Sequence, residues 1–189
     1  MAPLASTDAT ARILLNSTAI GFALSEVSIR LRSAANRGGS NADQGSVVAV
    51  VVGVTTGVVV AVWSAVGISA TTIHGRWLPF VVGLLMMWLG ITLREWAVWT
   101  LGSFFTIVVR ITQAQSVVDR GPYRWVRHPS YTGLLLTLVG LGFALGNWLS
   151  VLALAVLPTI GLVIRIRVEE QALLAALGEG GVRGLSQHL

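Results

Sequence analysis

The sequence contains no cysteine and no lysine, and charged residues make up only 11% of its 189 positions. The lack of cysteine excludes disulfides and thiolate chemistry, and three scattered histidines alone predict no metal site. Soluble domains carry about 25% charged residues. Together with a hydrophobic content of 54%, the scarcity of charge indicates an integral membrane protein, with a single domain spanning residues 1–189.

Apolar segments that cross a bilayer as a helix contain about 20 residues. Residues 128–164 carry no Asp, Glu, Lys or Arg, and one helix of this length would measure about 55 Å, against a hydrocarbon core of about 30 Å. Gly146-Asn147 near the middle of the run predicts a turn, and hence a C-terminal helical hairpin. We therefore expect an all-α bundle of about five transmembrane helices, at about 12–29, 46–70, 77–99, 131–146 and 148–166.

The arginines are distributed unevenly between the two ends of this expected bundle. All 13 basic residues are arginine, and the five-helix arrangement puts all except Arg12 and Arg76 on one side. The positive-inside rule then places segment 94–130 and the C-terminus in the cytoplasm. A lysine-free composition rich in Ala, Val and Gly suggests a GC-rich bacterial genome, so we expect a bacterial plasma membrane. The net charge of +5 forms no basic face away from the membrane, which argues against nucleic acid as a partner.

Two weaker patterns concern local structure. Residues 96–109 are apolar and aromatic but too short to span, which favours an interfacial or re-entrant helix. The pairs Gly53/Gly57 and Gly142/Gly146 have the spacing that permits close helix contact, although chance explains them equally well in a chain with 21 glycines.

Two polar clusters flank the uncharged run. The first, residues 120–133, holds three arginines, one histidine and two tyrosines, and its prolines predict irregular backbone. The second is Arg165-Ile-Arg167-Val-Glu169-Glu170. A hairpin between them would bring both clusters to the same membrane face, where they could form one site. The simpler interpretations are headgroup anchoring for the first cluster and a solvated helix end for the second.

The first cluster contains the motif Arg127-His128-Pro129-Ser130-Tyr131-Thr132-Gly133, and the second contains Arg165-x-x-x-Glu169-Glu170. These two motifs, separated by a helical hairpin, resemble the isoprenylcysteine carboxyl methyltransferase family, whose wider group includes membrane phospholipid methyltransferases. The resemblance covers about residues 90–179. It implies a small transmembrane bundle that transfers a methyl group from S-adenosyl-L-methionine to the carboxylate of a prenylated cysteine.

The resemblance also implies which residues form the site, within about 108–133 and 165–170. Arg165 would be the substrate-side, catalytic residue. The cofactor contacts would be Gln115, Ser116, Val117, Val118, Tyr123, His128, Pro129, Ser130, Tyr131 and Glu169.

The acceptor and the activity itself stay open at this point. A bacterial chain suggests a lipidated or isoprenoid small-molecule acceptor. The alternatives are a phospholipid amine N-methyltransferase and a non-catalytic membrane homologue. The second alternative is suggested by the glycine-rich tail after Glu179, which lacks the tyrosine found in the family.

Overall fold

The computed structural model describes residues 4–35, 40–41, 45–75, 77–102, 110–111 and 120–186. Helices dominate, which confirms the expected all-α class. They are α1 (Leu4–Thr7), α2 (Ala9–Ala35), α3 (Ser46–Gly67), α4 (Trp77–Leu101), α5 (Pro129–Ala144) and α6 (Trp148–Ser186), with short 3-10 helices η1 (Ser69–Thr71) and η3 (Gly121–Arg124). Strands β1 (Ser40–Asn41) and β2 (Arg110–Ile111) form a two-residue antiparallel pair.

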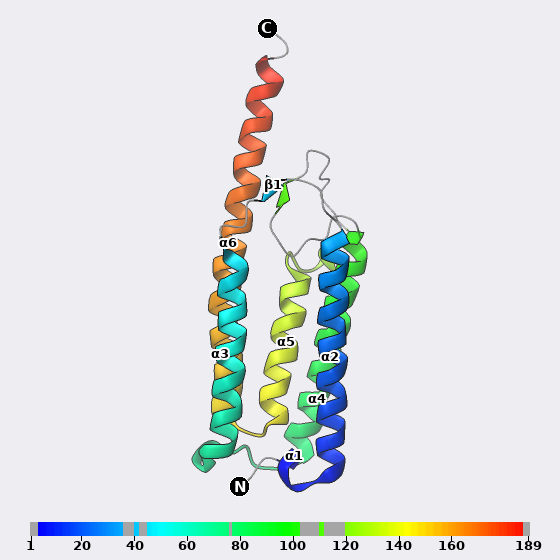
Figure 1. Ribbon diagram of the computed structural model, residues 1–189, viewed down its shortest axis with the longest axis vertical. Coiled ribbons are helices and arrows are strands. Elements are labelled where there is room, and N and C mark those ends of the chain that lie inside the picture. Colours follow the sequence, from blue (N-terminus) through cyan, green and yellow to red (C-terminus); the bar gives the residue numbers. More distant parts are fainter. Residues whose placement is uncertain are drawn as a thin grey trace.

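The long helices lie side by side and alternate in direction (Figure 1). In that view α2, α4 and α6 run upward, while α3 and α5 run downward. The start of α5 and the later part of α6 therefore share one end of the bundle, as the hairpin prediction requires. We call this end, which also holds the last turns of α2 and α4 and the start of α3, the polar end.

Three described helices are long and apolar enough to cross a membrane: Ser46–Gly67, Trp77–Leu101 and Trp148–Gln171. Helix α5 is apolar but shorter, and α2 forms at the expected first span without reaching the same apolar character. Large hydrophobic side chains such as Val59, Val66, Leu85 and Leu89 point outward. An apolar exterior of this kind suits contact with lipid tails. The chain is thus an all-α integral membrane bundle.

The predicted turn between the last two helices is confirmed. Gly146 adopts a positive φ of 67°, and Asn147 is almost completely buried beside it. The Asn147 amide nitrogen donates to the carbonyls of Ser64 and Ile68 at the end of α3, at 3.2 and 3.1 Å. Its Oδ1 accepts from backbone N–H groups in the first turn of α6. One side chain therefore caps α6 and ties the hairpin to α3.

Glycines on α4 and α5 let these two helices approach closely. A Cβ on Gly83 would meet the backbone of Gly140 and Ala144, and a Cβ on Gly90 would meet the backbone of Gly133 and both the hydroxyl and the backbone of Thr137. Gly53 and Gly142 make comparable approaches to α6, whereas Gly146 serves only the turn.

The bundle consists of two tightly packed helix pairs. Helix α3 packs along α6 and α4 along α5, and the pairs join through α5 and α6. Helix α2 packs on α4. Within the described chain, α2 and α3 form no extensive contact, so they border a space floored by α5.

Two local expectations were wrong. Residues 96–101 continue α4 and do not start a separate interfacial helix, while 103–109 lie outside the described residues. Helix α6 does not end near residue 166 but continues to Ser186, beyond the ends of the other helices (Figure 1).

Candidate active site

The two polar clusters meet at the hydroxyl of Tyr131, in the first turn of α5. This hydroxyl accepts a hydrogen bond from Arg165 Nε at 3.1 Å and donates one to Glu169 Oε2 at 3.0 Å. Arg165 and Glu169 are one turn apart on α6, so their side chains lie on the same face of that helix and both reach Tyr131 of α5. Arg165 also donates from Nη1 to the Ser46 hydroxyl of α3, at 2.8 Å, and is only 5% exposed. Helices α3, α5 and α6 together fix its guanidinium.

A second buried arginine lies on the other side of α5. Arg94 of α4 is 8% exposed and donates from Nε and Nη2 to the two carboxylate oxygens of Glu26 on α2, at 2.6 and 3.2 Å. Its Nη1 donates to the carbonyl and hydroxyl of Ser130, at 3.0 and 3.1 Å. A buried guanidinium needs such a partner, because an uncompensated charge there is strongly destabilising.

Further polar contacts hold α2 against α4 near this pair. The Ser25 hydroxyl donates to Glu95 Oε1 at 2.6 Å, and Arg32 approaches Glu95 Oε2 to 4.0 Å. The Arg32 guanidinium also lies 4.1 Å from the ring centroid of Trp99. Helix α2 is therefore positioned by polar contacts concentrated at the polar end.

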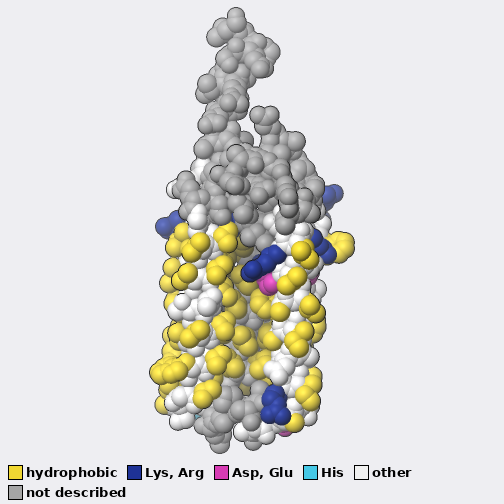
Figure 2. Space-filling view, viewed as in Figure 1, with side chains coloured by type: hydrophobic (Ala, Val, Ile, Leu, Met, Phe, Trp, Pro, Cys, Tyr) yellow, Lys and Arg dark blue, Asp and Glu magenta, His cyan; other side chains and the backbone are white. Residues whose placement is uncertain are grey.

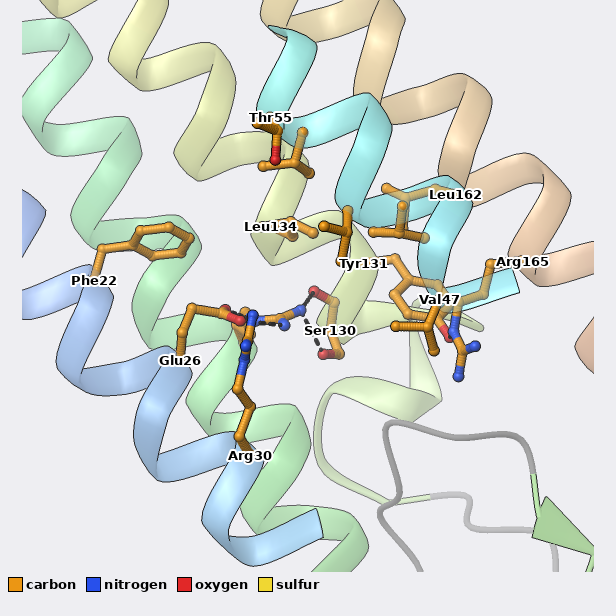
Figure 3. A pocket seen from close by; sticks show the side chains of 14 residues that line it. Phe22, Glu26, Arg30, Val47, Thr55, Ser130, Tyr131, Leu134, Leu162 and Arg165 are labelled. Atoms are coloured by element: carbon orange, nitrogen blue, oxygen red, sulfur yellow. Dashed lines mark hydrogen bonds and ion pairs between the residues drawn. The ribbon is translucent and has the colours of Figure 1, made fainter. Parts of the chain in front are cut away.

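A pocket of about 400 Å³ lies between these two arginine sites (Figure 3). Its apolar walls come from α3 and α2, and its floor comes from α5. Figure 2 shows a hollow along this face of the bundle, flanked by hydrophobic side chains, with charged groups at its upper end. The apolar lining is Phe22, Val47, Val50, Val51, Val54, Leu134 and Leu162; the polar lining is Glu26, Arg30, Thr55, Arg94, Ser130, Tyr131 and Arg165.

The segment before α5 brings two more predicted residues to the polar end. The His128 ring stacks on Tyr131, with centroids 5.5 Å apart and planes inclined by 14°. Tyr123 in η3 is partly buried, and burial together with the negative charge of Glu169 raises the pKa of its hydroxyl above the ordinary value. Gly121 begins η3 with a φ of 59°, and a Cβ there would press on Thr100 of α4. The polar turn is therefore seated against α4.

The structure brings together all the predicted site residues that it describes. Tyr123, His128, Pro129, Ser130, Tyr131, Arg165 and Glu169 all lie at the polar end. Gln115, Ser116, Val117 and Val118 lie outside the described residues.

Comparison with known proteins identifies the family of this chain. Residues 81–175 match the model of the "Isoprenylcysteine carboxyl methyltransferase (ICMT) family". The chain belongs to this family.

Named relatives match up to about half of this chain. The chain is 40% identical over 79 residues to a probable protein-S-isoprenylcysteine O-methyltransferase of Oryza sativa, covering 41% of each chain. It is 39% identical over 93 residues to protein-S-isoprenylcysteine O-methyltransferase B of Arabidopsis thaliana, covering 48% of this chain and 47% of the relative. The human protein-S-isoprenylcysteine O-methyltransferase is 37% identical over 97 residues, covering 50% and 33%. The chain thus spans about half the length of these relatives or less.

Sequence reasoning missed the pocket residues that come from α2 and α4. Neither Arg94 nor Glu26 belongs to the two polar clusters from which the site was predicted. Their pairing is a helix-to-helix contact between positions 68 apart, and no local motif marks it. A weak signal did exist, because two opposite charges within apolar segments are costly unless they find partners.

Proposed function

We propose that this member of the isoprenylcysteine carboxyl methyltransferase family transfers a methyl group from S-adenosyl-L-methionine to the carboxylate of an isoprenylcysteine-like lipid. The observation that carries the proposal is the pocket, whose valine-rich walls end at Arg165. A volume of about 400 Å³ lies within the range of small-molecule sites. The apolar walls suit an isoprenoid tail, and a guanidinium suits a carboxylate.

The described residues fit the proposed cofactor. Glu169 uses Oε2 toward Tyr131, and no described residue donates to its Oε1. That oxygen can accept from a ribose hydroxyl or an amine, while the stacked rings of His128 and Tyr131 border the same end. Tyr123, Pro129 and Ser130 would complete the described part of this site, and Gln115, Ser116, Val117 and Val118 are proposed for the rest. When bound, S-adenosyl-L-methionine supplies an activated methyl group on a sulfonium.

The chain's own contribution is positioning. A carboxylate is already a nucleophile, so the acceptor needs no base to remove a proton. Arg165 would hold the carboxylate, and Tyr131 and Ser46 would fix the direction of that guanidinium. Alignment of the reacting groups in a water-poor site can lower the activation barrier by several kcal/mol. In the best intramolecular reactions the barrier falls by roughly 7–11 kcal/mol.

We further propose that the polar end faces the cytoplasm. The bundle places Arg30, Arg32, Arg124, Arg127 and Arg167 at this end, and the other end has Arg12.

Cysteine introduced at exposed Trp125 should react with an impermeant reagent only from the cytoplasmic side, and labelling from outside would reverse this assignment.

The acceptor assay tests the proposed chemistry directly. The protein in detergent should methylate S-farnesylcysteine acid and leave its amide unmodified, because only the acid offers a carboxylate. Transfer of radiolabelled methyl from S-adenosyl-L-methionine measures the product. Methylation of phosphatidylethanolamine in place of the acid would establish the phospholipid amine alternative. Absence of cofactor binding by the wild-type protein would establish the non-catalytic one.

Two neighbouring glutamates on α6, Glu169 and Glu170, allow the proposed cofactor site to be tested against a control. Glu169→Gln should weaken S-adenosyl-L-methionine binding about tenfold, because a hydrogen bond to a charged acceptor is lost. Glu170→Gln should bind as the wild type does, since Glu170 is exposed and adjacent to the site residue. Calorimetry in detergent measures both. Equal affinity in the two variants would remove Glu169 from the cofactor site.

A further inference from the structure

The pocket lining carries more positive than negative charge. The described lining contains the guanidinium groups of Arg30, Arg94 and Arg165 and a single carboxylate, that of Glu26. Glu26 is fully committed to Arg94, which uses both of its oxygens. Arg165 is held by Tyr131 and Ser46. Among the described side chains, Arg30 forms no ion pair.

The position of Arg30 on α2 directs it to the pocket. Phe22, Glu26 and Arg30 follow one another at intervals of four, so they form a single stripe on one helix face. Figure 3 shows Arg30 reaching toward Glu26 from α2, with Arg165 on the opposite side and Ser130 between them. Arg30 is exposed whereas Arg94 and Arg165 are buried, so Arg30 stands where the pocket meets water.

Helix α2 lies outside the segment matched to the family, residues 81–175. A role for Arg30 therefore follows from this bundle and not from the shared segment. An anionic group that enters the pocket above Ser130 would have guanidinium groups on both sides. Arg165 offers a guanidinium fixed by hydrogen bonds, and Arg30 offers an exposed charge.

We propose that Arg30 is a specificity-determining residue that captures the anionic group of the acceptor at the mouth of the pocket. This inference rests on the proposed function and adds a second acceptor contact. Arg30 acts in binding, because its charge favours acids over neutral analogues before the carboxylate reaches Arg165. The methyl transfer itself needs no participation from Arg30.

The test compares three variants of the full chain in detergent, with S-farnesylcysteine acid as the probe. Arg30→Gln should raise the KM for the acid on the order of tenfold and leave kcat and cofactor affinity unchanged. Arg30→Lys should retain most of the wild-type KM, because an exposed site needs the charge and not the planar fork. Arg12→Gln is the control, since Arg12 is an exposed arginine at the other end of the same helix.

The dependence of KM on ionic strength distinguishes a role of Arg30 in binding from a purely structural role. Salt screens exposed charges over about 10 Å at 0.1 M. The KM of the wild type should therefore rise with salt, and the KM of Arg30→Gln should respond less.

A KM for Arg30→Gln equal to that of Arg12→Gln, in a preparation that methylates the acid, would overturn the role of Arg30 and leave the proposed function standing. A wild-type protein that neither binds nor methylates the acid would overturn the proposed function and, with it, the acceptor that Arg30 would capture.

Discussion

Replacement of Arg165 with lysine should lower the turnover of S-farnesylcysteine acid by about a hundredfold. Lysine keeps the charge but cannot donate in parallel to a carboxylate, and hydrogen bonds to charged groups contribute about 1.5–3 kcal/mol each. The substitution also removes the Nε contact to Tyr131 and the Nη1 contact to Ser46, at a side chain that is 5% exposed. Steady-state kcat at saturating S-adenosyl-L-methionine is the measurement.

The control for this variant is Arg167→Lys, two residues further along α6. Arg167 is exposed and does not line the pocket, so its substitution should leave turnover unchanged. Cofactor affinity should stay close to that of the wild type in both variants. If Arg165→Lys turns over the acid as fast as Arg167→Lys does, Arg165 does not hold the acceptor.

Substitution of Gly90 by alanine should destabilise the bundle by about 2–3 kcal/mol, as expected for overpacking of a well-packed interior. The added Cβ would clash with Thr137 Oγ1 and stand 2.5 Å from the carbonyl oxygen of Gly133. Neither α4 nor α5 can yield without moving its backbone, so the two helices must separate. Thermal unfolding in detergent measures the loss.

Gly67→Ala provides the matched comparison, because a Cβ at the end of α3 would meet nothing within 4 Å. This variant should unfold at the wild-type temperature or slightly above it, since alanine is the better helix former. Equal unfolding temperatures for the two variants would mean that the α4–α5 approach is looser than the structure shows.

The sequence was sufficient to predict the hairpin and the meeting of its two polar clusters. An uncharged run too long for one helix, interrupted by Gly146-Asn147, allows few other arrangements. Once both helices are antiparallel neighbours, the start of α5 and the later part of α6 must share an end. Tyr131, Arg165 and Glu169 then come together by geometry, and the structure adds that the Tyr131 hydroxyl lies between the other two.

The contacts that depend on which helices are neighbours could not be predicted in this way. Arg94 and Glu26 pair because α2 packs on α4, and nothing in either segment specifies that choice. The closest glycine approaches join Gly83 to Gly140 and Gly90 to Gly133, at intervals of seven along each helix. The four-residue glycine spacing does not include these positions, whereas it does include Gly146, which belongs to the turn.

Among the described residues α2 and α3 lack extensive contact, which has a kinetic consequence for the proposed acceptor, a lipid dissolved in the bilayer. The hollow between these helices lies on the flank of the bundle and is bordered by hydrophobic side chains (Figure 2). Encounter with such an acceptor is two-dimensional, so the rate depends on its mole fraction among the surrounding lipids and not on its molar concentration in the buffer. Adding inert detergent or lipid at constant protein and acceptor should therefore act as a diluent and slow the reaction.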